Sequence, residues 1–464
     1  MSIHTIRAKA PGVCPFCQAK LVAEIEAMPP LTPEPAGTSG AGTREQLQSR
    51  ISSRGLAILI GSLSIALLAF AVIVKLNNFE YFWYQPWVNF YSIVVGVFIL
   101  SRFIIAAFYS APPDVGFVPT VAVIVAARNE SDSIGKTIGR IYAEGYPKDR
   151  LEAIVVNDGS TDGTLAEMRL AQVRHPTLTI VDFEKNKGKR HGMAIGALLA
   201  HAEFLVYVDS DSFLMPGAIR KVLQGLANPT VAAVSGHTDV ENVRTNALSK
   251  MQDVRYFVSY RVMKAAESVF GAVSCCPGCF SAYRKSCVLN VLDRWLHQRF
   301  LGRYCTYGDD RSLTNYLLRD YRILYDDEAL ATTIVPEKWG IYVRQQARWK
   351  RSWVREFLFA GRWMWRKHPV AVISWYTMTL LPLIAPVIMF NALVLGPFMN
   401  DRPATFYIGG VLLVTLLWSF YYLEKTGRSY WWTGFLFVIT YMLFFSWQGY
   451  YSLLTVRKTK WGTR

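Results

Sequence analysis

The chain has 464 residues, of which 52% are hydrophobic and 14% aromatic, and its formal net charge is +16. This length exceeds that of one typical domain, and the apolar content argues against a wholly soluble protein. The positive charge favours anionic partners, either membrane lipids or nucleotide and polymer substrates.

The N-terminal tail, residues 1–54, is predicted to be largely flexible. Cys14 and Cys17 form a Cys-Pro-Phe-Cys knuckle, which is half of a zinc ribbon, but no second cysteine pair follows nearby. We therefore expect no closed zinc site within one chain. Residues 27–47 contain four prolines and a Gly-Thr-Ser-Gly-Ala-Gly run, which is typical of a flexible linker.

Five uncharged stretches each meet the requirement of roughly 20 residues for crossing a bilayer. A soluble core helix would rarely run so long without a charge, so these stretches predict membrane embedding. The first begins too far from Met1 to be a secretory signal peptide. The stretches are Gly55–Val74, Tyr81–Ser101, Pro369–Asn400, Pro403–Leu423 and Ser429–Val456.

Basic flanks indicate the orientation of these stretches. Arg44, Arg50 and Arg54 precede the first stretch, and Arg102 follows the second. By the positive-inside bias, the N-terminus and the long segment after Arg102 are cytosolic. The sequence therefore predicts a multi-pass protein of the plasma (inner) membrane with a large cytosolic domain.

The C-terminal stretches leave one conflict open. Two N-terminal and three C-terminal crossings would place the chain after Val456 outside, whereas four cations in residues 457–464 favour the cytosol. Three prolines interrupt Pro369–Asn400, so this stretch could form a kinked pair or a partly re-entrant element.

From Pro119 onward, apolar strand patterns alternate with helical ones. Such alternation predicts an α/β domain with a mostly parallel sheet, in which ligands bind beyond the carboxyl ends of the strands. The expected strands are Thr120–Ala126, Ala153–Asn157, Leu178–Asp182 and Val206–Val208, and the expected helices are Ile134–Ala143, Leu165–Gln172 and one from about Gly188.

Polar motifs stand at three of these strand ends. They are Arg128-Asn129-Glu130, Asn157-Asp158-Gly159-Ser160 and Asp209-Ser210-Asp211. Asp209 and Asp211, two residues apart at a strand end, could both face one Mg²⁺ or Mn²⁺ that bridges to nucleotide phosphates. The alternative for Asp209-Ser210-Asp211 alone is a solvated strand end, but three such ends together favour a nucleotide pocket.

Asn186-Lys187-Gly188-Lys189-Arg190 adds cations and a glycine at a helix start, which suits a diphosphate. An ordinary basic helix cap is the alternative. No Gly-x-x-x-x-Gly-Lys-Ser/Thr sequence occurs, which disfavours a P-loop nucleotidase.

Two later motifs combine acidic and basic groups with helices. In Cys305–Tyr316, an acidic pair lies at the mouth of a helix that begins near Asp310, and it could accept a hydroxyl proton or simply cap the helix. Gln345–Glu356 opens a basic amphipathic segment that runs to His368, which favours a membrane-interface helix. An interface helix alone does not need the Gln-x-x-Arg-Trp at its head.

Four motifs, in this order and flanked by spans, resemble the signature of processive inverting family-2 glycosyltransferases. They are Asp158, Asp209-Ser210-Asp211, Gly308-Asp309-Asp310 and Gln345-x-x-Arg348-Trp349. That family includes cellulose, chitin and hyaluronan synthases and the nodulation chitooligosaccharide synthases. The likeness covers roughly residues 55–464. It implies two transmembrane helices at 55–110, a GT-A-type cytosolic glycosyltransferase domain at 111–343, an interface helix at 344–368, a transmembrane region at 369–456 and a basic gating tail at 457–464.

Within the family, three segments look most like those of hyaluronan synthases: Cys305–Asn315, Gln345–Glu356 and the terminal Trp461–Arg464. Those enzymes usually carry a Ser-Gly-Pro loop at the acceptor site, where this chain has Cys275–Phe280, which is more similar to chitooligosaccharide synthases. The resemblance thus implies polymerisation of hyaluronan from UDP-GlcNAc and UDP-GlcA, with export through the spans. The alternative is a chitin oligosaccharide synthase that uses UDP-GlcNAc alone.

The resemblance also implies roles for individual residues. Asp310, with Asp309 beside it, would be the general base, and Asp209 and Asp211 would hold the UDP and its Mg²⁺ or Mn²⁺. The implied donor-binding residues are Asn129, Glu130, Asp158, Lys187, Lys189, Arg190, Asp209, Cys305, Gln345, Arg348, Trp349, Trp461 and Arg464. The implied acceptor-binding residues are Cys276, Pro277, Gly278, Cys279 and Trp349.

Two further classes stay open as alternatives. A non-processive lipid-phosphate sugar transferase would share the Asp-x-Asp strand but should lack Gln-x-x-Arg-Trp. A transporter or receptor with a nucleotide-sensing domain would be favoured by intramembrane charges along a substrate path, which the five stretches do not offer. The expected partners are UDP-sugars, the growing polysaccharide and membrane lipids, with no nucleic acid.

Overall fold

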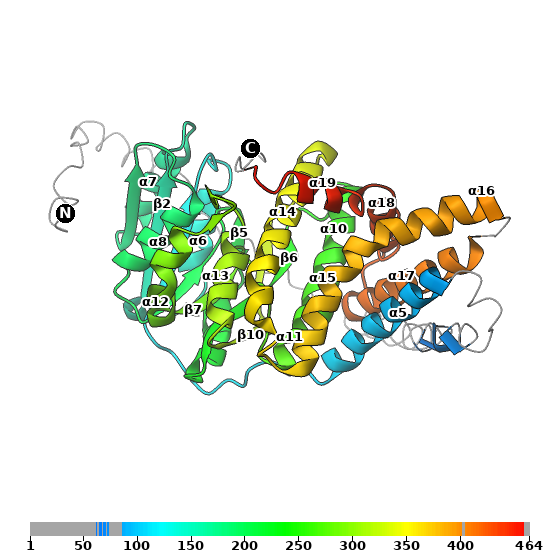
Figure 1. Ribbon diagram of the computed structural model, residues 1–464. Helices are drawn as coiled ribbons and strands as arrows, with labels where there is room; N and C mark the ends of the chain where they lie inside the picture. The colour runs from blue at the N-terminus through cyan, green and yellow to red at the C-terminus, as the bar shows by residue number, and fades with distance from the viewer. Residues whose placement is uncertain are drawn as a thin grey trace, which may run out of the picture. The chain divides into compact units, whose positions relative to one another are not determined.

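The computed structural model describes residues 86–400 and 404–458, together with a few positions between 62 and 73. The Cys14–Cys17 knuckle, the linker, most of the first expected span and the terminal Trp461–Arg464 lie outside the described residues. The chain from Gly55 onward forms one compact unit (Figure 1).

An eight-stranded sheet forms the centre of the α/β domain. Its strands are β1 Val121–Ala127, β2 Leu151–Asp158, β3 Leu178–Phe183, β4 Phe204–Tyr207, β5 Ser212–Leu214, β6 Val231–Val240, β7 Ser281–Arg284 and β10 Arg322–Thr333. The strand order is β3-β2-β1-β4-β7-β6-β10-β5. Strands β3, β2, β1 and β4 pair in parallel, as do β6 and β10, whereas β7 and β5 run antiparallel to their neighbours. The expectation of a mostly parallel sheet is confirmed.

Helices cover both faces of this sheet (Figure 1). They are α6 Ile134–Tyr142, α7 Thr164–Arg174, α8 Lys189–Leu199, α9 Ala218–Gln224, α10 Ala247–Val258, η3 Ser259–Lys264, α11 Ala265–Val269, α12 Lys285–Leu296 and α13 Asp309–Leu318. Three short elements, η1 Lys148–Arg150, η2 Gly225–Ala227 and the hairpin of β8 Arg299–Phe300 and β9 Arg303–Tyr304, join them.

Alternate residues of β1 serve the two cores, because successive strand side chains point to opposite faces. Val123 and Val125 belong to the core under α6 and α7, where Ile138 is fully buried. Ile124 belongs to the opposite core, with Met193 of α8. The continuous apolar run thus reflects a strand that is buried on both faces.

The expected strands and helices over residues 120–199 are present, with ends shifted by a few residues. The Asp-x-Asp strand needs a correction. Strand β4 ends at Tyr207, and Asp209 and Asp211 lie in the tight turn to β5, where the Ser212 N–H donates to the Asp209 carbonyl at 3.0 Å. A turn rather than strand alternation therefore sets the relative direction of the two carboxylates.

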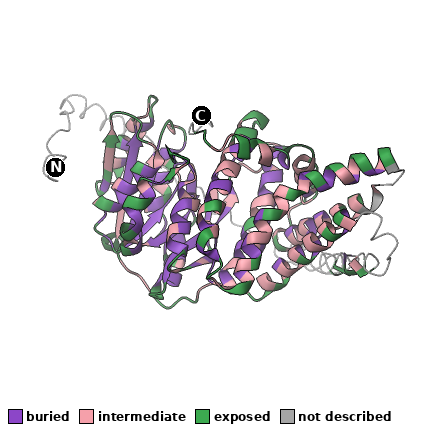
Figure 2. Cartoon of the chain, in the orientation of Figure 1, coloured by how far each residue is buried: buried purple, intermediate pink, exposed green. Residues whose placement is uncertain are grey.

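Among the described elements, further helices follow the α/β domain, and α5 precedes it. They are α5 Pro86–Ala107, α14 Trp339–Met364, α15 Pro369–Phe390, η4 Asn391–Leu395, α16 Gly396–Asn400, α17 Thr405–Thr426, α18 Thr433–Thr440, η5 Tyr441–Phe445 and α19 Gln448–Leu454. Within the described residues, three helical runs are long and apolar enough to cross a membrane: Pro86–Ala107, Pro369–Met399 and Tyr407–Thr426. Figure 2 shows exposed residues along α5 and α15–α17, in contrast to the buried strands.

One expectation for the C-terminal region was wrong, the crossing at Ser429–Val456. Pro369–Met399 is one helical run that contains Pro382 and Pro386 and the π-helical stretch η4. Ser429–Val456 holds no helix long enough to span, because α18 with η5 covers only Thr433–Phe445. Apolar composition alone could not distinguish a crossing helix from two short helices packed against the protein.

This correction changes the count on which the conflict over the tail rests. After the α/β domain, two helical runs of the described residues, Pro369–Met399 and Tyr407–Thr426, are long and apolar enough to cross a membrane, where three were expected. Helix α19 then lies beside α14, with the Ser452 hydroxyl donating to the Ala347 carbonyl at 3.4 Å (Figure 1). The Tyr307 hydroxyl of the α/β domain donates to the Lys458 carbonyl at 2.7 Å, so the tail begins at that domain.

Two glycine substitutions test the packing of α8 on β1. A Cβ at Gly196 would lie 2.5 Å from Cγ2 of Ile124, whereas a Cβ at Gly139 of α6 would meet nothing within 4 Å. Gly196→Ala should therefore destabilise the fold by about 1–3 kcal/mol through overpacking. Gly139→Ala should be neutral or stabilise by up to about 1 kcal/mol. Thermal melting of the two purified variants checks the order, and equal melting temperatures would contradict it.

Candidate active site

The polar residues at the ends of β1 and β2 hold each other in place. Asn129 has a left-handed backbone, φ 54°, and its amide oxygen accepts from the Thr161 N–H at 2.9 Å. The Glu130 N–H donates to the Thr164 hydroxyl at 2.7 Å, and its carboxylate accepts from the Ser133 hydroxyl at 3.1 Å. These contacts join the two strand ends into one rim of the site.

Asp158 shapes the loop before α8. Its carboxylate accepts from the Lys187 N–H at 2.6 Å and from the Gly188 N–H at 3.0 and 3.1 Å. Burial raises the pKa of Asp158, and the two backbone donors act in the opposite direction. Gly159, φ 63°, lies so close to this loop that a Cβ would be 2.5 Å from the Asn186 nitrogen. The Lys187 side chain stays exposed.

Asp209 and Asp211 lie just after the end of β4, an inner strand of the sheet. Asp209 forms an ion pair with Lys189, the first residue of α8. Burial acts to lower the pKa of Lys189, but Asp209 outweighs it and the pKa is raised. Burial, followed by the Asp209 charge, raises the pKa of Asp211 to about 7. The pair therefore carries carboxylate charge that the surrounding protein only partly compensates.

Asp209 and Asp211 fit a divalent cation only if water and substrate phosphates supply its other ligands. Within residues 86–400 and 404–458, no group of three or more His, Cys, Asp or Glu side chains could hold a metal alone. Carboxylate oxygens are nevertheless the ligands that Mg²⁺ and Mn²⁺ prefer, and Mg²⁺ usually completes its shell with water and substrate phosphates. The residues present fit an ion that binds together with a diphosphate.

The cysteine-rich loop Cys275–Phe280 lies against both this pair and the acidic pair. A Cβ at Gly278 would be 2.7 Å from Oδ1 of Asp209, so the loop backbone lies against the Asp209 carboxylate. The Cys275 thiol lies 3.9 Å from Oδ2 of Asp310. The Cys276 N–H donates to the Thr314 hydroxyl of α13 at 2.9 Å. The structure therefore brings together residues expected to bind donor, acceptor and proton.

The two acids of Gly308-Asp309-Asp310 have different surroundings. Asp309 is buried and accepts from Nε of Arg190 at 2.8 Å, and both side chains are at most 4% exposed. Asp310 is only partly buried, and its Oδ1 accepts from the Arg311 N–H at 2.8 Å. Asp310 is thus the more exposed of the two acids, while Arg190, which is expected to bind the donor, forms an ion pair with Asp309.

Helix α14 packs against the acidic turn Gly308-Asp309-Asp310. Gly308, φ 74°, packs so tightly that a Cβ would lie 1.8 Å from the Ser352 hydroxyl. Nη2 of Arg355 donates to the Tyr307 carbonyl at 2.7 Å, and Nε of Arg355 pairs with the fully buried Glu356 at 2.9 Å. Only glycine fits at 308, because both its φ and its neighbours exclude a side chain.

The Gln-x-x-Arg-Trp residues lie one to two turns earlier on α14. Burial lowers the pKa of Arg348, and the nearby site carboxylates, Asp310 foremost, act to raise it. Gln345 is half-buried. The guanidinium of Arg255 lies 5.6 Å from the ring centre of Trp349 and donates to the Tyr342 hydroxyl at 3.3 Å. Cys305 is buried in the loop before Gly308, and Trp461 and Arg464 lie outside the described residues.

Sequence reasoning missed two residues of this arrangement, Arg255 and Gln298, and gave no role to Glu356, the last residue of the Gln345–Glu356 motif. Arg255 and Gln298 contact the motifs but belong to no recognisable spacing. Glu356 offered the one usable signal, because a lone acid in a strongly basic helix points to a buried partner.

Comparisons with known proteins agree with this geometry. A family model described as "Glycosyltransferase like family 2" matches residues 119–352. The chain is 28% identical over 404 residues to a hyaluronan synthase from Streptococcus pyogenes, covering 85% of this chain and 94% of that protein. It is 33% identical over 245 residues to an N-acetylglucosaminyltransferase from Mesorhizobium japonicum, covering 52% and 58% respectively.

Among solved structures, a mannosyltransferase from Pyrobaculum calidifontis in complex with GDP-Man and Mn²⁺ aligns with a TM-score of 0.53 at 22% identity. The alignment covers 75% of this chain and 99% of that chain, and it shows the same GT-A fold.

The α/β domain and its site are those of a glycosyltransferase with a GT-A fold. Because the family match spans half of its length, the chain belongs to glycosyltransferase family 2. The chain is therefore an enzyme, as the motif resemblance implied, and hyaluronan synthases and rhizobial N-acetylglucosaminyltransferases are among its relatives.

Arg190→Gln tests whether this arginine supports the fold or binds the donor. Removing one partner of a buried pair leaves Asp309 uncompensated, which should cost about 3–5 kcal/mol of stability. Lys187→Gln, in the exposed loop three residues earlier, is the matched control and should leave stability unchanged. Thermal melting and donor binding are measured on both. An Arg190→Gln variant that melts normally but has lost donor affinity would show that the arginine contacts the diphosphate.

Proposed function

We propose that the chain is a membrane-embedded processive synthase that polymerises hyaluronan from UDP-GlcNAc and UDP-GlcA by inverting transfer and exports the polymer through its own helices. One observation carries the proposal: the likeness to the hyaluronan synthase extends over 85% of this chain and 94% of that protein, so it includes the membrane helices. We further propose that the α/β domain faces the cytosol, in line with the basic flanks of the first two expected spans.

In this proposal the strand-end rim receives the donor. Asp158 would border the uracil while it holds the Lys187–Gly188 loop, with Asn129 and Glu130 closing the neighbouring strand end. Arg348 would pair with the diphosphate, since a guanidinium matches phosphate oxygens. A divalent ion held by Asp209 and Asp211 would supply neutralisation of the charge on the leaving diphosphate.

Asp310 would be the base that takes the proton from the acceptor hydroxyl. It is partly exposed, and its Oδ1 is oriented by the Arg311 N–H. Asp309 would act as a positioning residue through its buried pair with Arg190. Trp349 would stack on the acceptor sugar, and the adjacent Arg255 guanidinium suits a polymer that carries carboxylates.

A second candidate is synthesis of chitin oligosaccharides from UDP-GlcNAc alone. Two observations favour it: the Cys276-Pro277-Gly278-Cys279 loop and the 33% identity to a rhizobial N-acetylglucosaminyltransferase. That identity extends over only 52% of this chain, which is why we rank it second.

The choice of donors tests the proposal directly. Purified enzyme with Mg²⁺ or Mn²⁺ should form polymer only when UDP-GlcNAc and UDP-GlcA are both supplied, and hyaluronidase should digest the product. Each donor alone is the control. Polymer from UDP-GlcNAc alone that chitinase digests would establish the second candidate instead.

Two carboxamide variants separate donor binding from proton transfer. Asp211→Asn should abolish metal-dependent binding of UDP-sugars, because an amide is a poorer ligand for a hard cation. Asp310→Asn should keep donor binding and lose turnover by at least about a hundredfold, since only the proton acceptor is removed. Calorimetry with UDP-sugar and Mn²⁺ measures binding. Equal loss of binding in both variants would contradict the assignment of Asp310 as the base.

We propose that the tail Trp461–Arg464 closes over the bound donor. Lys458, whose carbonyl accepts from the Tyr307 hydroxyl, is three residues from Trp461, so the tetrapeptide starts within about 10 Å of Lys458. Deleting Trp461–Arg464 should lower turnover at least about tenfold, equivalent to about 1.4 kcal/mol, without changing membrane insertion. Full activity of the truncated enzyme would refute the gate.

A further inference from the structure

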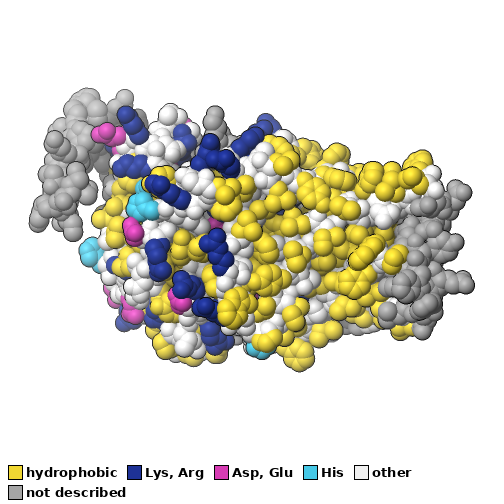
Figure 3. Space-filling view, in the orientation of Figure 1, with side chains coloured by type: hydrophobic (Ala, Val, Ile, Leu, Met, Phe, Trp, Pro, Cys, Tyr) yellow, Lys and Arg dark blue, Asp and Glu magenta, His cyan; other side chains and the backbone are white. Residues whose placement is uncertain are grey.

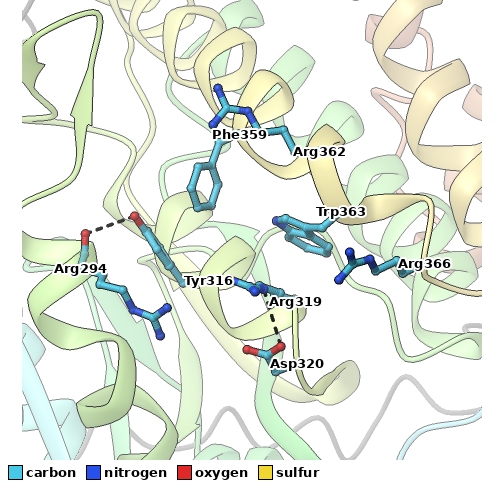
Figure 4. Close-up of a pocket in the computed structure, with 8 residues that line it drawn as sticks. All are labelled: Arg294, Tyr316, Arg319, Asp320, Phe359, Arg362, Trp363 and Arg366. Atoms are coloured by element: carbon cyan, nitrogen blue, oxygen red, sulfur yellow. Dashed lines mark hydrogen bonds and ion pairs between the residues drawn. The ribbon is translucent and has the colours of Figure 1, made fainter.

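A cavity of about 310 Å³ opens between α12, α13 and α14, outside the site described above (Figure 4). It lies at the far ends of the helices that carry the catalytic motifs: Tyr316 is seven residues beyond Asp309 on α13, and Arg362 is fourteen beyond Arg348 on α14. At 1.5 Å per helical residue, these separations are about 10 and 20 Å. The lining residues are Arg294, Tyr316, Arg319, Asp320, Phe359, Arg362, Trp363 and Arg366.

The lining carries a strong excess of positive charge. Four arginines stand against one acid, Asp320, which lies 3.8 Å from Arg319. Within residues 86–400 and 404–458, the structure gives none of the other three arginines a carboxylate partner. Figure 4 shows these side chains arriving from three different helices. Four guanidinium groups around one cavity repel each other unless an anion joins them.

One side chain in the wall of the cavity has a hydrogen-bond donor without a partner among the described residues. Trp363 is 8% exposed, and its Nε1–H has no hydrogen-bond partner among the described residues. A buried indole N–H normally finds an acceptor, so its position in the wall of the cavity points to an acceptor brought by a ligand. The aromatic rings of Tyr316 and Phe359 line the same space, which suits a ligand with an apolar portion.

The cavity lies next to the start of a membrane-spanning helix. Arg366 is three residues before Pro369, where the helical run Pro369–Met399 begins. Trp365 is 61% exposed and Leu358 is 50% exposed on the same part of α14, as expected where a helix meets lipid headgroups. Figure 3 shows lysine and arginine side chains gathered beside the broad hydrophobic surface.

We propose that this cavity binds the phosphate group of an anionic phospholipid, and that the bound headgroup ties α12 and α13 to α14. Guanidinium groups pair bidentately with phosphate oxygens. Trp363 Nε1 donates to a further oxygen of the headgroup, and the aromatic wall packs against the glycerol. The ligand lies on the outer side of the helices that hold the acid pair and the Gln-x-x-Arg-Trp motif, and its binding does not depend on which polymer the enzyme makes.

Lipid binding to the purified full-length protein tests the proposal. In mixed detergent micelles, fluorescent phosphatidylglycerol should bind at least about tenfold more tightly than fluorescent phosphatidylcholine. Arg362→Gln combined with Arg366→Gln should weaken phosphatidylglycerol binding about 25-fold, since each arginine near an anionic lipid contributes about fivefold. Arg169→Gln, which removes an exposed arginine on α7, is the control and should bind like the unaltered protein.

Trp363→Phe keeps the ring and removes only the N–H, so it tests the cavity even if the double variant fails to fold. It should weaken phosphatidylglycerol binding about threefold or more. Equal binding of the two lipids, or unchanged binding by both the double variant and Trp363→Phe, would overturn the proposal. Displacement of phosphatidylglycerol by millimolar inorganic phosphate would assign the cavity to a soluble phosphate compound and overturn the lipid assignment.

Discussion

Two buried arginine–carboxylate pairs, Arg190–Asp309 between α8 and α13 and Arg355–Glu356 within α14, belong to one network that holds these three helices together. Gln298 connects them: its amide oxygen accepts from Arg190 at 3.3 Å, and its amide nitrogen donates to Glu356 at 3.1 Å. Buried charges of this kind contribute little net stability when complete, but losing one partner is very costly. The network therefore specifies one arrangement of α8, α13 and α14.

This arrangement gives the two neighbouring acids different surroundings. Asp309 is buried in the protein interior by its pair with Arg190, so its helix has a fixed first turn. Asp310, one residue later, extends partly exposed from that turn. Arg355 of α14 donates to the preceding Tyr307 carbonyl, and the Tyr307 hydroxyl donates to the Lys458 carbonyl. Helix α14, the acid pair and Lys458 thus meet at one short loop.

The sequence predicted the α/β domain well, because continuous apolar strands and amphipathic helices alternate regularly between residues 120 and 199. It also identified the motif residues that now lie together, since carboxylates at strand ends share one edge of a parallel sheet. It failed where several structures satisfy the same pattern. Apolar residues 429–456 suit a crossing helix as well as two short packed ones. Contacts between distant segments, such as Gln298 with Glu356, have no local signature at all.

Gly278 carries a consequence for how such an enzyme can change its specificity. Its Cα lies against the Asp209–Lys189 pair, and even one methyl group there would meet both side chains at 2.7 Å. The loop Cys275–Phe280 therefore forms part of the wall around Asp209. A substitution that reshapes this loop also shifts the Asp209 carboxylate, so the loop and the strand-end carboxylates cannot change independently in evolution.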